Sequence, residues 1–338
     1  MGKFVILAAG IGGDESTRSK FLEDIAKQLP EGFALKIPPG WDERTVCMNA
    51  KDADVILGSS VSRDLIMSAP KVRLIQVLGS GVEKVDIDTA IERRITVCNS
   101  VGENAVEVAE HAVALMLALS KNLHRYQRDL PSGRWARTRA ITLTGKALGI
   151  IGLGSIGIEV VKRVRPFGMR VLAIKKHPRS DMKEKLGLTF LGGPENLDYV
   201  LAESDFVLLS VVLTEQTRGM IGEKEFARMK AGSYLINIAR GELVDEPALV
   251  GALQSGKLAG AGLDVFQTEP VKLDNPLLKL DNVILTPHVG GGVWPPELTS
   301  RRVAFLVGNI VKALRGEKPD NIVDSVLKYA HRTTPLVI

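Results

Sequence analysis

The stretch Gly149-Ile-Ile-Gly-Leu-Gly-Ser-Ile-Gly157 decides how the middle of this chain folds. It contains the spacing Gly152-x-Gly154-x-x-Gly157, which follows an apolar run and opens a predicted helix. In this context the first glycine allows a tight turn, the second lets the backbone approach a pyrophosphate, and the third lets helix and strand pack closely. The amides of Ser155 and Ile156 would then face the phosphates at the positive end of the helix dipole. The stretch therefore predicts a dinucleotide-binding unit of the Rossmann type.

Apolar and amphipathic segments alternate on both sides of this stretch, which predicts parallel sheets with helices on both faces. About six strands are predicted around it, at residues 147–152, 170–174, 205–213, 233–239, 260–265 and 282–286, with helices at 155–167, 223–229 and 246–254. Near the N-terminus the predicted strands are residues 4–9, 55–57 and 74–78, with a helix at 21–29. Residues 103–123 predict a helix that is apolar nearly all round, typical of a domain junction or a subunit interface. One more long helix is predicted at residues 297–314.

Length and composition limit the class of protein. At 338 residues the chain is too long for one ordinary core, so two domains are expected. The net charge of +5 comes without a dense basic run, and no apolar stretch reaches the roughly 18 residues of a membrane span, so neither nucleic acid nor a membrane is an expected partner. Cys47 and Cys98 lack metal-ligand spacing, so we expect no metal site and a reduced, cytoplasmic setting.

Three polar residues follow three predicted strands: Arg240, Glu269 and His288. Ligands of open α/β sheets bind beyond the carboxyl ends of the strands. Each residue also has a structural interpretation: Arg240 in a surface ion pair, Glu269 as a turn residue, and His288 as a turn cap. Taken together, an arginine can hold a carboxylate with forked hydrogen bonds, and a histidine can protonate an alkoxide that develops as hydride arrives. A glutamate on the other ring nitrogen would stabilise the imidazolium form, so the set predicts the reduction of a 2-keto acid.

The residues after the second strand of the Rossmann unit bear on the cofactor. An NAD site needs an acidic residue there to hold the ribose hydroxyls. The sequence instead has the cations Lys175, Lys176, His177 and Arg179. Such a patch fits a 2′-phosphate better than a hydroxyl, so the sequence favours NADP over NAD. The alternative is a solvated basic turn that tolerates either cofactor.

Several motifs in order carry a resemblance to a known family: the glycine stretch, Ala239-Arg-Gly-Glu-Leu-Val-Asp-Glu246, Asp264-Val-Phe, and Thr286-Pro-His-Val-Gly290. With them the chain resembles the D-isomer specific 2-hydroxyacid dehydrogenases, of the glyoxylate/hydroxypyruvate reductase kind. The resemblance implies that Arg240 binds the substrate and polarises its carbonyl, that Glu269 tunes the histidine, and that His288 is the acid/base.

The same resemblance implies two groups of ligand contacts. Substrate contacts would come from the backbone amides of a loop that grips the substrate carboxylate: Gly79, Ser80, Gly81 and Val82. Further cofactor contacts would be Val211, Ala239 and Asp264, with Asp264 near the nicotinamide carboxamide and ribose. Gly290 and Gly291 are expected to leave room for the nicotinamide ring. His111 is expected to be a structural histidine.

The resemblance also implies an α/β fold of two doubly wound parallel-sheet domains. A Rossmann-type dinucleotide-binding domain, residues 102–291, would be inserted in a flavodoxin-like substrate-binding domain, residues 1–101 plus 292–338. A hinged cleft would lie between them, residues 103–123 would be the linking helix, and a homodimer is expected. Trp294 would narrow the pocket or cap the final helix.

Three functions remain open from the sequence. The first is NAD(P)-dependent reduction of a small 2-keto acid, with glyoxylate or hydroxypyruvate favoured. The second is phosphoglycerate or formate oxidation on the same scaffold. The third is a non-enzymatic nucleotide-sensing binding protein, against which stands the lack of a disordered interaction tail in this sequence.

Overall fold

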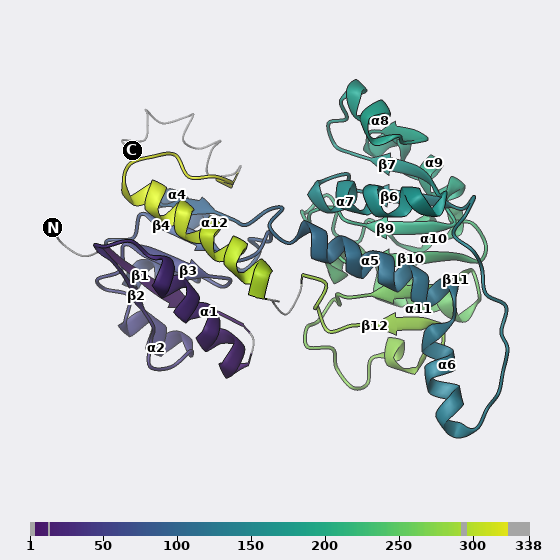
Figure 1. The fold of residues 1–338 in the computed structure, drawn as a ribbon, viewed down its shortest axis with the longest axis horizontal. Helices are drawn as coiled ribbons and strands as arrows, with labels where there is room; N and C mark the ends of the chain where they lie inside the picture. The colour runs from purple at the N-terminus through teal and green to yellow at the C-terminus, as the bar shows by residue number, and fades with distance from the viewer. Residues whose placement is uncertain (1–3, 13, 292–295, 324–338) are drawn as a thin grey trace. The chain divides into compact units, whose positions relative to one another are not determined.

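The computed structural model describes residues 4–12, 14–291 and 296–323. The chain divides into two compact units, which we call the first unit (Met1–Glu103 with Trp294–Ile338) and the second unit (Asn104–Val293). Each unit contains one parallel sheet (Figure 1). Within the described residues, no helix is long and apolar enough to cross a membrane.

The first unit has a five-stranded sheet in the order β2-β1-β3-β4-β5, the flavodoxin-like order. Its strands are β1 Phe4–Ala9, β2 Phe33–Lys36, β3 Val55–Gly58, β4 Leu74–Val77 and β5 Thr96–Cys98. Its helices are α1 Glu15–Gln28, α2 Glu43–Met48, α3 Arg63–Ser68, α4 Ile87–Glu92 and α12 Pro296–Leu314. The predicted flavodoxin-like fold is confirmed, but β2 and β5 were not predicted, because each is short and β2 buries only its first residue.

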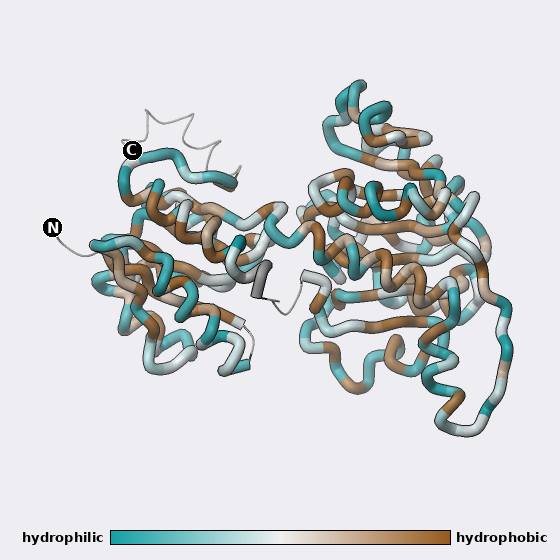
Figure 2. The backbone as a smooth tube through the Cα atoms, viewed as in Figure 1, coloured by the Kyte–Doolittle hydropathy of each residue, from teal (hydrophilic) through white to brown (hydrophobic). Residues whose placement is uncertain are grey.

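Helices cover both faces of this sheet, and hydrophobic segments line its interior (Figure 2). On one face α1 and α12 pack against apolar side chains such as Ile6, Val55 and Leu74. On the other face α2, α3 and α4 pack against alternate residues of the same strands. Successive strand residues point to opposite faces, so a strand that is apolar at every position needs cover on both.

The second unit has a seven-stranded sheet in the order β12-β11-β10-β9-β6-β7-β8. Numbered from β6, this is the Rossmann order 3-2-1-4-5-6 with one more strand at the end. The strands are β6 Ala147–Ile151, β7 Arg170–Ile174, β8 Phe190–Gly192, β9 Phe206–Leu209, β10 Ser233–Asn237, β11 Leu258–Leu263 and β12 Val283–Leu285. The helices are α5 Ala105–Ser120, α6 Leu123–Asp129, α7 Ser155–Val164, α8 Ser180–Leu186, α9 Leu197–Glu203, α10 Glu223–Arg228 and α11 Glu246–Gln254. α5, α7 and α8 cover one face, and α9, α10 and α11 cover the other.

Two predicted elements of this unit differ in extent from the structure. The strand predicted to reach residue 213 ends at Leu209. The amide of Ser210 still donates to the carbonyl of Ile151 on β6 at 2.9 Å, and its hydroxyl donates to the carbonyl of Gly152 at 2.8 Å. The helix predicted at residues 103–123 is broken at Asn122, whose φ of +55° is left-handed. The seventh strand, β8, was missing from the predicted set of about six. The burial of α5 is accounted for by its own unit, since it packs on α7 and the sheet (Figure 1).

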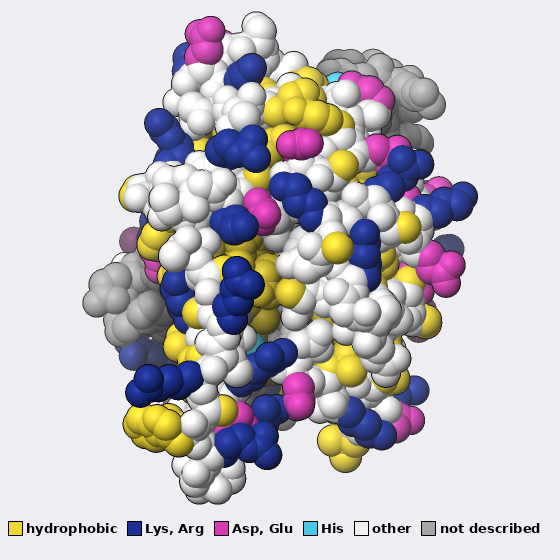
Figure 3. Space-filling view, turned by 90° about the vertical axis from the view of Figure 1, so that its right-hand side faces the viewer, with side chains coloured by type: hydrophobic (Ala, Val, Ile, Leu, Met, Phe, Trp, Pro, Cys, Tyr) yellow, Lys and Arg dark blue, Asp and Glu magenta, His cyan; other side chains and the backbone are white. Residues whose placement is uncertain are grey.

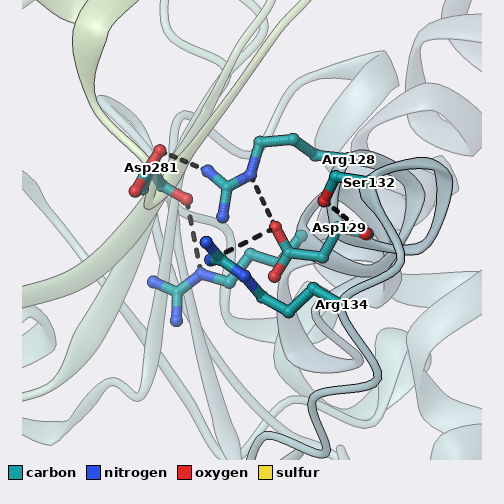
Figure 4. Close-up of polar contacts among 6 residues, drawn as sticks. Arg128, Asp129, Ser132, Arg134 and Asp281 are labelled. Carbon is teal, nitrogen blue, oxygen red and sulfur yellow. Dashed lines mark hydrogen bonds and ion pairs between the residues drawn. The ribbon is translucent and has the colours of Figure 1, made fainter.

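The segment that follows α6 projects from the second unit. The start of this segment is held by two ion pairs, which Arg128 forms with Asp129 and Asp281 (Figure 4). Beyond it, residues 131–140 are all exposed, and 78% of Trp135 is accessible to solvent. We call residues 131–140 the arm. Figure 3 shows Lys and Arg side chains scattered over this side of the molecule, with hydrophobic side chains exposed between them.

Candidate active site

The glycine stretch forms a tight loop between β6 and α7. Gly152 has a φ of +103°, and a Cβ there would lie 2.6 Å from the amide nitrogen of Val211, so only glycine fits. A Cβ on Gly154, the residue before α7, would meet no heavy atom within 4 Å, so open space lies beside the helix start. A Cβ on Gly157 would lie 3.0 Å from the carbonyl oxygen of Gly152, so helix and strand are closely packed. This shape supports a pyrophosphate at the amides of Ser155 and Ile156.

Lys175 is the first residue after β7. Its Nζ donates to the carbonyl of Leu153 at 3.0 Å, which places the ammonium group over the glycine loop. Lys176 and His177 are exposed, whereas Arg179 forms an ion pair with Asp181 at 3.3 Å. The cationic patch predicted here is therefore partly neutralised, and Lys175 is the member that adjoins the loop.

His288 and Glu269 are in direct contact. Nδ1 of His288 lies 2.7 Å from Oε2 of Glu269, while Oε1 accepts a hydrogen bond from the amide of Phe266 at 3.1 Å. Both side chains are partly exposed to solvent. Because Nδ1 is engaged by the carboxylate, Nε2 is the ring nitrogen left to exchange a proton with a substrate.

The carboxyl of Glu269 is held in its charged form. Burial alone would raise the pKa of Glu269, but the hydrogen bonds from His288 and Phe266, with the charges of His288 and Arg240, outweigh it. The pKa of Glu269 is therefore lower than that of an ordinary glutamate. A carboxylate that stays charged can only accept a hydrogen bond, so Nδ1 of His288 is the donor in this contact.

Arg240 lies in the turn after β10. Asn237 donates its side-chain amide to the carbonyl of Arg240 at 2.8 Å, and Nη1 of Arg240 donates to the carbonyl of Ala239 at 2.7 Å. A Cβ on Gly241 would lie 1.9 Å from the carbonyl carbon of Phe266, so this turn rests directly on the segment that carries Glu269. The structure thus brings Arg240, Glu269 and His288 together at the carboxyl ends of β10, β11 and β12.

Asp264, just past β11, holds the turn that carries His288. Its carbonyl accepts the amide of His288 at 2.8 Å. Its Oδ1 accepts the hydroxyl of Thr286 at 2.6 Å and the amide of Val289 at 2.9 Å, and its Oδ2 accepts the amide of Gly290 at 2.8 Å. A Cβ on Gly290 would lie 2.8 Å from Oδ2, so the neighbour that requires glycine there is this carboxylate. A Cβ on Gly291 would lie 2.8 Å from the side-chain amide nitrogen of Asn104. The room that Gly290 and Gly291 would leave for a nicotinamide ring stays a prediction.

The buried carboxylate of Asp264 is stabilised by these donors. Only 2% of the residue is exposed, and burial would raise its pKa. Hydrogen bonds from His111, Thr286, Val289 and Gly290 outweigh burial and lower the pKa of Asp264. By linkage, a carboxyl whose pKa falls on folding adds stability above its unfolded pKa of about 4, and this stability is lost as the pH falls through the folded pKa.

We expect Asp264→Asn to lower the free energy of unfolding by about 2–3 kcal/mol at pH 7, because an amide group would then face backbone N–H donors. The difference from the wild type should narrow as the pH falls below about 4, because the carboxyl of the unfolded wild type is protonated there while the folded one, whose pKa is lower, is still charged. Urea unfolding at pH 7 and below about pH 4 measures the free energy of unfolding of wild type and variant. Asp274→Asn, at an exposed position, is the control. If the difference in the free energy of unfolding is the same at both pH values, the charged carboxylate of Asp264 is not what stabilises the turn.

The loop predicted to bind the substrate carboxylate follows β4 in the first unit. The carbonyl of Gly79 accepts the amide of Ser100 at 2.9 Å, and the carbonyl of Ser80 accepts the side-chain amide of Asn99 at 2.8 Å. These bonds fix the backbone of the loop. That the amides of Gly79, Ser80, Gly81 and Val82 bind the substrate carboxylate stays a prediction. Trp294 lies outside the described residues. In the part of the chain that is described, no group of three or more His, Cys, Asp or Glu side chains is placed to hold a metal ion.

Sequence reasoning missed two contacts of this site. Nε2 of His111, on α5, lies 2.9 Å from the hydroxyl of Thr286 and 3.4 Å from Oδ1 of Asp264. His111 was expected to be a structural histidine, and its contacts now place it beneath the His288 turn. The one signal was its position on a nearly all-apolar helix, where a polar ring needs a partner.

Comparisons with known proteins agree with this geometry. Residues 113–290 match the family model "D-isomer specific 2-hydroxyacid dehydrogenase, NAD binding domain". A glyoxylate reductase from Korarchaeum cryptofilum is 36% identical over 88% of this chain and 91% of its own. A D-3-phosphoglycerate dehydrogenase from Methanocaldococcus jannaschii is 39% identical over 89% of this chain, but the chain spans only 57% of that relative's length.

A solved structure has the same architecture. The NADPH-dependent glyoxylate/hydroxypyruvate reductase from Sinorhizobium meliloti, in complex with NADP and malonate, is 28% identical with a TM-score of 0.82, covering 96% of this chain and 98% of that one. The family model alone covers more than half of the sequence, and the glyoxylate reductase matches most of both chains. This chain therefore belongs to the D-isomer specific 2-hydroxyacid dehydrogenase family.

Proposed function

We propose that the protein is an NAD(P)-dependent D-2-hydroxyacid dehydrogenase that interconverts a small 2-keto acid and its 2-hydroxy acid, with glyoxylate or hydroxypyruvate as the favoured keto acid. The observation that carries the proposal is the 2.7 Å contact between Nδ1 of His288 and Oε2 of Glu269. It lies at the same strand ends as Arg240, in a unit whose glycine loop has open space beside Gly154. The relatives named glyoxylate reductase support the choice of substrate.

Arg240, His288 and Glu269 have separate roles in the proposed reaction. A nicotinamide cofactor held at the glycine loop would supply the chemistry of hydride transfer to the carbonyl carbon of the keto acid. Arg240 binds the substrate through its forked guanidinium and draws electron density toward the carbonyl oxygen. Nε2 of the His288 imidazolium gives that oxygen its proton, and the ring becomes neutral. Glu269 remains charged throughout and stabilises the protonated ring before transfer.

Initial rates over a panel of keto acids test the proposal. We expect glyoxylate and hydroxypyruvate to support oxidation of the reduced cofactor. The loss of absorbance of the reduced cofactor measures this oxidation. If no keto acid of the panel is turned over, the proposed function is wrong. If the protein binds the cofactor tightly without turnover, a nucleotide-sensing binding protein becomes the better account.

A second candidate is oxidation of a phosphorylated hydroxy acid. It is favoured by the 39% identity to a D-3-phosphoglycerate dehydrogenase. The panel therefore includes 3-phosphohydroxypyruvate. Formate, the remaining alternative, is tested separately with the oxidised cofactor, because it would give up a hydride and not accept one. A kcat/KM for 3-phosphohydroxypyruvate at least about tenfold above that for glyoxylate, equal to about 1.4 kcal/mol of transition-state binding, would favour this candidate.

Lys175 bears on the choice between NADPH and NADH. We expect the wild type to prefer NADPH, because the ammonium beside the glycine loop pairs with a 2′-phosphate. Lys175→Asp should shift the ratio of kcat/KM values toward NADH by about 100-fold, since it replaces an attraction with a repulsion. The matched control is Lys183→Asp, an exposed lysine on α8. Equal or better wild-type rates with NADH would contradict the preference.

Two further properties stay predictions. A homodimer is supported by the arm, where Trp135 is exposed beside Arg134, Arg137 and Arg139. Arg134 lies 3.8 Å from Asp129, and the arm itself has no acidic residue. A cytoplasmic location fits two cysteines that are free thiols, of which Cys98 is buried.

A further inference from the structure

The backbone at His288 is held in an unusual conformation. Its φ of +53° is left-handed, which costs energy for a residue with a side chain. The turn persists because its neighbours fix it, and Asp264 does so from β11 through four hydrogen bonds. A second neighbour, His111, reaches the same turn from α5.

His111 touches the turn on both sides of His288. Its Nε2 lies 2.9 Å from the hydroxyl of Thr286, two residues before His288. A Cβ on Gly290, two residues after His288, would lie 3.3 Å from Cδ2 of the same ring. The imidazole of His111 therefore hydrogen-bonds to the turn before His288 and lies close to it after His288.

The protons of this network have one consistent arrangement. The hydroxyl of Thr286 has one hydrogen, and its 2.6 Å contact with Oδ1 of Asp264 uses it, because a carboxylate only accepts. The Thr286 oxygen must then accept from His111. Nε2 of His111 therefore carries a hydrogen, and the nearby Oδ1 of Asp264, at 3.4 Å, attracts the same N–H.

We propose that His111 is a positioning residue for His288: by donating Nε2–H to Thr286 beside Asp264, it holds the strained turn so that the His288 ring meets Glu269. The kinetic part of its test rests on the proposed function. The spectroscopic part does not rest on it, so a failure of the positioning role can be told apart from a failure of the proposed function.

The kinetic test compares two substitutions of His111. His111→Leu should lower kcat by about 10- to 100-fold, because small misplacements of a catalytic group are costly, with the KM for NADPH within about twofold. His111→Gln, whose side-chain amide can donate in place of Nε2–H, should recover most of kcat. The matched control is His124→Leu, on α6. A kcat for His111→Leu equal to that of the wild type, or no recovery in His111→Gln, would overturn the proposal.

A double-mutant cycle asks whether His111 acts through Thr286. In a Thr286→Val background, His111→Leu should change kcat by less than about twofold, because the hydroxyl that receives the hydrogen bond is already gone. If His111→Leu costs as much there as in the wild type, the effect does not pass through Thr286 and the proposal is wrong.

Nuclear magnetic resonance of the full chain with ¹⁵N-labelled histidine gives a readout without turnover. We expect the wild-type spectrum to show His111 protonated at Nε2, and His111→Leu to shift or broaden the ring signals of His288 while those of His124 stay in place. An Nε2 of His111 without a proton, or unchanged His288 signals in the variant, would refute the positioning role even if no keto acid is reduced.

Discussion

His288→Asn should lower kcat for keto-acid reduction by about 10²- to 10⁴-fold, the range that a general acid contributes. Asparagine is chosen because it tolerates left-handed backbone better than most residues, so the φ of +53° at this position can be kept. The variant loses the ring nitrogen that gives the proton to the carbonyl oxygen, but it retains the glycine loop that would bind the cofactor.

Single-turnover rates with a saturating keto acid measure this loss, and fluorescence of the bound reduced cofactor checks that its affinity is kept. His124→Asn is the matched control, because His124 lies on α6, outside the strand ends that carry the proposed site. If kcat of His288→Asn stays within about threefold of the wild type, a proton donor other than His288 must act, since an essential general acid cannot be lost at so small a cost.

Arg240→Lys should lower kcat/KM for the keto acid by about 10²- to 10³-fold, although the positive charge is kept. Lysine offers a point charge in place of the planar fork, so it cannot hold a carboxylate and polarise a neighbouring carbonyl at once. The turn itself should survive, because Asn237 holds the carbonyl of residue 240 whatever the side chain.

Steady-state kinetics against glyoxylate and hydroxypyruvate measure the effect, and the KM for the cofactor should change little. Arg218→Lys, an exposed arginine 3.9 Å from Glu242, is the matched control. An Arg240→Lys variant with wild-type kcat/KM would show that the substrate is not bound through a guanidinium fork.

Much of the second unit could be predicted because its signals are local. The spacing of Gly152, Gly154 and Gly157 predicts a turn, a close approach to a ligand and a packing contact. The structure shows the turn at Gly152, open space at Gly154 and the packing contact at Gly157. Arg240, Glu269 and His288 could be found because parallel strands place their carboxyl ends along one edge. The order of the motifs along the chain was enough to identify the family.

The parts that were missed depend on distant contacts. His111 and Thr286 are 175 positions apart in sequence, so no local pattern indicates that one binds the other. The predicted helix reached residue 123 because Leu123 is apolar, whereas α5 ends at Ser120 and Asn122 has left-handed backbone. Strand β2 was missed because it is a four-residue edge strand of which only the first residue is buried.

The place of α12 in the first unit has a consequence for synthesis on the ribosome. The five strands of that sheet are complete once residue 98 has been made, but one apolar face is covered in part by Val303, Leu306 and Ile310 from α12. The second unit, which is a continuous stretch of chain, can fold while that face of the first unit is covered only by α1. A nascent chain stalled before α12 is therefore the species that chaperones must protect from aggregation.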